Sequence, residues 1–139
     1  MKELTLEAAV ENIHKVTEFV NAELDQLNCP KKARFQIDVA IDELFGNIAK
    51  YAYNPRTGQA TVRVEVVREP LSVEITFIDD GKAYNPLEKT DPDVSLSAEE
   101  REIGGLGIYM VKKSMDAIRY QYENGKNILR IKKHMLKEK

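Results

Sequence analysis

Apolar residues recur every three or four positions over residues 5–27, and they do so again over residues 30–52. That spacing places them on one side of an α-helix, so the pattern predicts two amphipathic helices. Thr5 suits the N-cap of the first helix, and Pro30 suits the first position of the second. The apolar stripe of the second helix comprises Ile37, Ile41, Leu44 and Ile48.

Apolar and polar residues alternate in four later segments, at residues 60–66, 71–77, 117–123 and 126–132. A period of two predicts half-buried strands of an antiparallel sheet. Asn124-Gly125, between the last two segments, is typical of a type I′ hairpin turn. A third helix is predicted to begin at the glycines of residues 104–107 and to bury Ile108, Val111 and Met115.

The order of these segments indicates the fold class. Two helices, two strands, a long loop, a helix and two strands predict an α+β two-layer sandwich. Its sheet would be mixed but mostly antiparallel, with about three helices packed on one face. The loop, residues 82–103, lacks periodicity and contains Pro86 and Pro92. A loop of this length inside a compact domain is usually functional or disordered, and Ser97 and Glu100 could cap one short helical turn in it.

Length and composition narrow the classes of protein. The 139 residues fit one domain, 1–139, and the net charge of −2 argues against a broad nucleic-acid surface. No apolar run is long enough for a membrane helix, and the first residues lack a signal core. The lone Cys29 fits a reducing compartment, and His14 and His134 have no zinc-site spacing. We therefore expect a cytoplasmic protein without a membrane or a direct nucleic-acid partner.

Three polar motifs carry candidate chemistry. Glu43 and Asn47 lie one turn apart at the edge of the second helix's apolar stripe, where they could hold a hard cation or polarise a hydroxyl. The alternative is a pair of solvated side chains. Asp79-Asp80-Gly81 ends an apolar strand, and a carboxylate there could accept a hydrogen bond from an amino group. An ordinary strand-ending turn would use the same residues.

The third motif is Gly104-Gly105-Leu106-Gly107 in front of the third helix. Glycines allow close backbone approach, and a helix N-terminus presents free N–H groups to phosphate. The segment does not match a P-loop, because no Gly-Lys-Ser/Thr follows it. A flexible hinge is the alternative interpretation.

Taken together and in this order, the motifs resemble the GHKL superfamily of ATP-binding domains, which has the Bergerat fold. Within it the chain is most similar to the small bacterial anti-sigma-factor serine/threonine kinases. The resemblance rests on Asp42-Glu43-Leu44-Phe45-Gly46-Asn47, on Asp79-Asp80-Gly81-Lys82-Ala83-Tyr84-Asn85-Pro86 and on Gly104-Gly105-Leu106-Gly107-Ile108-Tyr109-Met110-Val111, and it covers essentially the whole chain.

The resemblance implies a role for each matching residue. Glu43 would be the general base that takes a proton from a substrate serine, Asn47 would coordinate Mg²⁺, and Asp79 would bind the adenine amino group. Residues 82–103 would be the ATP lid. The remaining nucleotide contacts would come from Gly81, Ala83, Gly104, Gly105, Leu106 and Gly107.

Some positions depart from the family pattern. Ala83 replaces the usual second glycine after the aspartate, and it fits only if the backbone there does not need a positive φ. Tyr51 stands where many relatives carry His. Several of the kinases have an Arg just before the second glycine box, where this chain has Ile103 and Gly104. Arg101 is the nearest substitute, and Lys82, Lys89, Lys112 and Lys113 are other possible cations.

The resemblance implies an ATP-dependent protein serine/threonine kinase. It would use ATP and Mg²⁺ and phosphorylate a STAS-type anti-sigma-antagonist protein. It would regulate transcription by partner switching, with a sigma factor as a second candidate partner. The resemblance also suggests a homodimer. The alternative is a nucleotide-gated module that sequesters a sigma factor or another regulator with little or no phosphate transfer. A detached histidine-kinase-like domain is a third interpretation, although no long dimerisation helix with a phosphoacceptor histidine is present.

Overall fold

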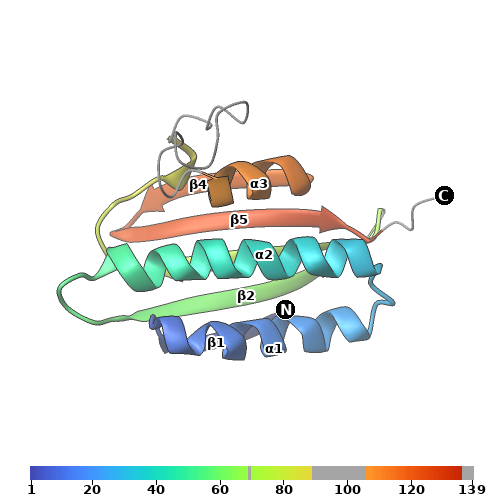
Figure 1. The fold of residues 1–139 in the computed structure, drawn as a ribbon, viewed down its shortest axis with the longest axis horizontal. Coiled ribbons are helices and arrows are strands. Elements are labelled where there is room, and N and C mark those ends of the chain that lie inside the picture. Colours follow the sequence, from blue (N-terminus) through green and yellow to red (C-terminus); the bar gives the residue numbers. More distant parts are fainter. Residues whose placement is uncertain (69, 89–105, 136–139) are drawn as a thin grey trace.

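The alternating segments of the chain form a five-stranded antiparallel sheet with strand order β1-β2-β3-β5-β4. The computed structural model describes residues 1–68, 70–88 and 106–135. Three helices lie on one face of the sheet, and α2 runs across its middle (Figure 1). The predicted two-layer α+β sandwich is confirmed. The strands are β1 (Lys2–Glu7), β2 (Gln59–Val67), β3 (Ser72–Asp79), β4 (Ala117–Glu123) and β5 (Lys126–His134).

The core lies between the sheet and the helices. Strand register aligns Val62 of β2, Phe77 of β3 and Leu129 of β5 in one row across the sheet, and all three are buried. Every second residue of a strand faces the same side, so this row and its neighbours form a continuous apolar surface. The helices that cover it are α1 (Ile13–Asp25), α2 (Lys31–Asn47) and α3 (Leu106–Ser114). None of the helices in this described part of the chain is both long and apolar enough to cross a membrane.

The first segment differs from the prediction of a single helix over residues 5–27. Residues Lys2–Glu7 form the edge strand β1, and the helix begins only at Ile13, after a 3-10 turn. Thr5 therefore does not cap a helix, and its hydroxyl lies 2.9 Å from that of Thr61 on β2. Leu6 lies on the helical stripe with Val10 and Ile13 but also fits a period of two with Leu4, and pairing with β2 supplies backbone hydrogen bonds to this edge.

The second helix ends where predicted, near Ala52, but its last turn is of a different type. Pro30 is its N-cap rather than its first helical residue, and the regular α-helix ends at Asn47. Residues Ile48–Ala52 continue it as one wider, π-helical turn. Such turns are rare in proteins, and those that occur often lie at functional sites.

The hairpin between β4 and β5 is confirmed. Asn124 and Gly125 both have positive φ, 53° and 75°, as a type I′ turn requires. The third helix is also confirmed, with Leu106 as its first described residue. The proposed capping box at Ser97 and Glu100 lies outside the described residues.

Two phenylalanines of α2 allow the packing to be tested. Phe45 is fully buried, whereas Phe35, on the same helix, is 65% exposed. We expect Phe45→Ala to lower the free energy of unfolding by about 3–5 kcal/mol, because it leaves a cavity in the core. Phe35→Ala should change it by less than about 0.5 kcal/mol, as is usual for surface substitutions. Urea unfolding of both variants measures the difference, and equal losses would contradict this packing.

Candidate functional site

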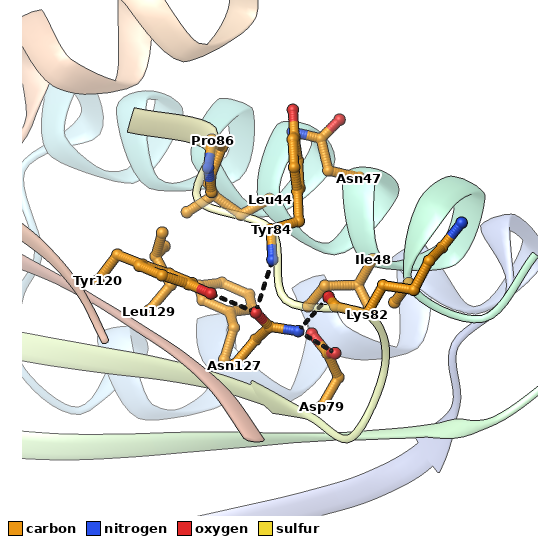
Figure 2. A pocket seen from close by; sticks show the side chains of 12 residues that line it. Leu44, Asn47, Ile48, Asp79, Lys82, Tyr84, Pro86, Tyr120, Asn127 and Leu129 are labelled. Carbon is orange, nitrogen blue, oxygen red and sulfur yellow. Dashed lines mark hydrogen bonds between the residues drawn. The ribbon is translucent and has the colours of Figure 1, made fainter. Parts of the chain in front are cut away.

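A small cavity lies between the C-terminal end of α2, the ends of β3 and β5, and the segment that follows β3 (Figure 2). Its volume is about 40 Å³. Apolar side chains form most of its wall, and Asp79 and Asn127 are its buried polar residues. The lining residues are Leu44, Asn47, Ile48, Ala52, Phe77, Asp79, Lys82, Tyr84, Pro86, Tyr120, Asn127 and Leu129.

Asp79 is the last residue of β3, and only 5% of its surface is exposed. One carboxylate oxygen, Oδ1, accepts hydrogen bonds from the backbone N–H of Gly81 and from Nδ2 of Asn127, each at 2.9 Å. No described residue donates a hydrogen bond to the other oxygen, Oδ2. A fixed carboxylate with one oxygen unpartnered within the described part of the protein suits recognition of a donor such as an amino group.

Asn127 holds this carboxylate in place. It lies directly opposite Asp79 in the β3–β5 register. Its Nδ2 also donates to the carbonyl of Lys82 at 2.8 Å, and its Oδ1 accepts from the Tyr84 backbone N–H at 3.0 Å and from the Tyr120 hydroxyl. Figure 2 shows Asn127 at the centre of these bonds. One buried amide thereby joins β3, β4, β5 and the start of the predicted lid.

Sequence reasoning missed Asn127 and Tyr120. The signal available was a polar residue at the first inward-facing position of β5, on the face that otherwise carries Leu129 and Ile131. A buried polar side chain on an apolar face needs a partner, because burying an unbonded amide is costly. The identity of that partner depends on strand register.

Burial raises the pKa of Asp79 above its ordinary value of 3.8. The hydrogen bonds from Asn127 and Gly81 oppose this rise, and the neighbouring negative charge of Asp80 adds to it. The pKa of the Tyr120 hydroxyl is raised as well, again mainly by burial. Both groups thus favour their neutral forms more than they would in water.

Gly81 is required by close packing against the end of the π-helical turn. A Cβ atom at this position would lie 2.3 Å from the carbonyl oxygen of Ala52, a backbone atom. The neighbouring Lys82 N–H donates to the same carbonyl at 3.0 Å. Ala83, which replaces the family's second glycine, has no positive φ, so alanine fits there without strain.

The structure also brings Glu43, Asn47 and Gly107 together. Asn47 Nδ2 donates to Glu43 Oε1 at 3.4 Å, a weak contact that points the amide nitrogen toward the carboxylate. A Cβ atom on Gly107 would lie 2.1 Å from Glu43 Oε2, so the carboxylate packs against the first turn of α3. Asn47 lines the cavity from α2 (Figure 2). Leu106, beside Gly107, is exposed.

Other predicted positions are placed differently. Gly104, Gly105, Arg101 and residues 89–103 of the predicted lid lie outside the described residues. Tyr51 is exposed and meets Tyr84 edge to face, with ring centroids 6.4 Å apart. Lys82 lines the cavity, and Lys113 Nζ lies 5.6 Å from the centroid of the Tyr109 ring.

The cavity has the chemistry of a nucleobase site. Asp79 Oδ2 offers an acceptor for an exocyclic amino group, and Ile48 and Leu129 offer apolar surface to a flat ring. Its volume is below the roughly 300–1,000 Å³ of typical ligand pockets. The cavity would therefore have to widen to admit a base.

The residues near Asn47 suit a cation only in company with phosphate. Within the described ranges, no three acidic, histidine or cysteine side chains gather closely enough to bind a metal. Mg²⁺ is commonly held by one or two protein oxygens, substrate phosphates and water. The Oδ1 atom of Asn47 accepts no hydrogen bond from the described residues, and it could serve as such a ligand.

The raised pKa of Asp79 predicts a pH dependence of stability. The folded chain holds this proton more tightly than the unfolded chain does. Its contribution to the free energy of unfolding therefore falls as pH rises above about 4, and it levels off above the folded-state pKa. Asp79→Asn removes the titration, so the stability of wild type relative to this variant should decline over that window. Unfolding curves at several pH values measure it, with Asp80→Asn as control. A difference that is flat with pH would contradict the assignment.

The chain is similar in sequence to a known family and to several named proteins. The sequence model of a family described as a histidine kinase-like ATPase domain matches residues 6–133. The serine/threonine-protein kinase BtrW of Bordetella bronchiseptica is 27% identical over 107 residues, which are 77% of this chain and 75% of BtrW. The serine-protein kinase RsbW of Listeria monocytogenes is 27% identical over 101 residues, which are 69% of this chain and 63% of RsbW.

A third relative carries a different name. The anti-sigma F factor of Caldanaerobacter subterraneus is 27% identical over 93 residues, which are 67% of this chain and 64% of that protein. The chain thus spans less than two thirds of RsbW and of the anti-sigma F factor. The family match covers nearly all of it, and it includes both Glu43 and Asp79. The chain therefore belongs to the histidine kinase-like ATPase domain family, as its GHKL-type motifs indicate.

Proposed function

We propose that this chain binds Mg-ATP and acts as a serine/threonine protein kinase on an anti-sigma-antagonist protein. One observation carries the proposal. A carboxylate with an unpartnered oxygen lies in the cavity, and a second carboxylate, Glu43, packs with Asn47 and Gly107 where α2 meets α3 in the described structure. Family membership and the names of the relatives support the same conclusion.

Asp79 and the cavity wall would select adenine. The Oδ2 atom would accept a hydrogen bond from the amino group of the base, and a guanine would present a carbonyl oxygen to it instead. Two acceptors facing each other leave a buried polar group unsatisfied, which costs about 1–3 kcal/mol. Asn127 would serve by fixing the direction of Oδ2.

Asn47 and the first turn of α3 would serve the phosphates. The Oδ1 atom of Asn47 would be the protein ligand of a Mg²⁺ ion, which when bound would neutralise phosphate charge. Gly107, with the sequence neighbours Gly104, Gly105 and Leu106, would give room for phosphate oxygens near backbone N–H groups. Residues 82–103, with Gly81 and Ala83 at their base, would form the lid.

Glu43 would act as the general base. Its carboxylate would accept the proton of a serine hydroxyl as the oxygen forms a bond to the γ-phosphorus. The bond from that phosphorus to the bridging oxygen would break, and ADP would leave. A carboxylate can do this only when it is positioned, since its ordinary pKa makes it a weak base. The contacts of Glu43 with Asn47 and Gly107 would supply that position.

The names of the relatives suggest the biological setting. A STAS-type antagonist would be the phosphoacceptor, and a sigma factor would be the second partner. The protein would act in the cytoplasm and could form a homodimer. The alternative function is a nucleotide-gated module that sequesters a regulator without transfer. The sequence favours it at one place, because Ile103 and Gly104 stand where several related kinases carry an arginine.

A phosphorylation assay separates the two functions. The protein is incubated with Mg²⁺ and γ-labelled ATP, together with each STAS-type protein encoded in the same genome. We expect label on a serine of one of them, and Glu43→Gln should slow transfer by about 10²- to 10⁴-fold. The glutamine side chain of this variant can still accept a hydrogen bond from Asn47, so ATP binding should persist.

Asp42→Asn, at an exposed neighbouring position, is the matched control and should transfer label like the wild type. Unchanged transfer by Glu43→Gln would show that Glu43 is not the base. Tight ATP binding without labelled product, beside nucleotide-dependent capture of a sigma factor, would favour the sequestering module.

A further inference from the structure

A groove with no role in the proposed nucleotide site runs between the first half of α2 and the second half of α3. These helices pack side by side (Figure 1). Two adjoining hollows of about 380 and 360 Å³ form the groove, and they share Lys32, Gln36, Lys113 and Ser114. Each is within the size range of recognised binding pockets.

The floor of the groove exposes large apolar side chains. Phe35 is 65% exposed and Met110 is 45% exposed, and Val39 and Tyr109 lie beside them in the same hollow. Single exposed apolar residues are ordinary, whereas apolar residues gathered in a hollow are typical of surfaces that bind another molecule. Aromatic and methionine side chains are also enriched in protein interfaces.

The rim of the groove is basic. Among the described residues that line the two hollows, Lys32, Lys113 and Lys133 are basic and Asp116 is acidic. Basic side chains therefore outnumber acidic ones on this part of a chain whose net charge is −2. Lys133 Nζ donates to the Ser114 carbonyl, and Asp116 accepts from the His134 backbone N–H.

These observations fix the chemistry of the occupant. We infer that the groove binds an acidic amphipathic helix of a partner protein. Its apolar side chains would cover Phe35 and Met110, and its carboxylates would face Lys113 and Lys133. An apolar stripe fits a groove between helices, and opposite charge at the rim sets orientation and partner choice. A two-fold contact of the groove with itself would instead bring two basic surfaces together.

The inference can be tested with a defined probe. We would use a labelled helical peptide of about five turns with leucines along one face and glutamates beside them. A matched peptide carries lysines in place of the glutamates. Fluorescence anisotropy should show binding of the acidic peptide alone, and rising ionic strength should weaken it.

Variants locate the site. Phe35→Ser with Met110→Ser should weaken binding by about tenfold or more, because both substitutions remove buried apolar contacts. Lys113→Glu should weaken it and reduce its salt dependence. Lys15→Glu on α1 and Tyr122→Ser on β4, both at exposed positions, are the matched controls and should leave binding unchanged. Circular dichroism checks the fold of each variant, and Mg-ATP binding should be retained, which separates this test from that of the nucleotide site.

Four outcomes would overturn the inference. The first is equal binding of both peptides or of neither. The second is binding that the groove variants do not alter. The third is a dimer in sedimentation velocity that Phe35→Ser with Met110→Ser dissociates, since the occupant is then a second copy. The fourth is tighter peptide binding after Asp91, Asp93, Glu99 and Glu100 are changed to their amides, since the chain's own acidic segment then fills the groove.

Discussion

The hydrogen bond between Asn127 and Asp79 is the contact on which the geometry of the cavity depends. It joins the inward-facing ends of two paired strands, β5 and β3, where polar side chains replace the apolar row. There Nδ2 of Asn127 donates a hydrogen bond to Oδ1 of Asp79. The other carboxylate oxygen, Oδ2, accepts no hydrogen bond from the described residues. Asn127 also holds the chain after β3, through the Lys82 carbonyl and the Tyr84 backbone N–H. A buried network of this kind is most stabilising when every member is bonded, and we propose that a donor group of the ligand completes this one at Oδ2 of Asp79.

Helix α2 connects this network to the rest of the domain. Its middle is anchored in the core by Ile41 and Phe45, and its C-terminal end carries Asn47 and the π-helical turn that meets Gly81. One side of α2 contacts α3. At one end of this contact Gly107 packs against Glu43, and at the other end the two helices form the groove. A nine-residue helix thus lies between the proposed phosphate site and the proposed partner surface.

Much of this arrangement follows from sequence patterns. Period-two alternation predicts β2 to β5, the Asn124-Gly125 turn is confirmed by its backbone angles, and the helical stripe identifies the core face of α2. The motif order predicts that Glu43 and Gly107, 64 positions apart, serve one site, and the structure brings them together. The motifs identify these residues because each carries a local signal, such as a glycine before a helix.

The misses have physical reasons. Leu6 fits a helical stripe with Val10 and a period of two with Leu4, and only pairing with β2 decides for a strand. Asn127 follows a hairpin turn, where an asparagine is unremarkable, and its partner lies 48 positions away. Gly81 signals close approach, but only the fold shows that the close atom is the Ala52 carbonyl. Each miss concerns a contact distant in sequence, which local patterns do not encode.

The central claim is that the unpartnered oxygen of Asp79 recognises the adenine of ATP. Calorimetric titration of Mg-ATP into the wild type, Asp79→Asn and Asp80→Asn tests it most directly. In Asp79→Asn the side-chain amide N–H would face the adenine amino group, so two donors would meet. A hydrogen bond to a charged group contributes about 1.5–3 kcal/mol, so this variant should bind at least about tenfold more weakly. Asp80→Asn removes one exposed negative charge and its ion pair with Lys126 but keeps the Asp79 carboxylate, so it should bind like the wild type. Equal affinities of the wild type and Asp79→Asn would contradict the account.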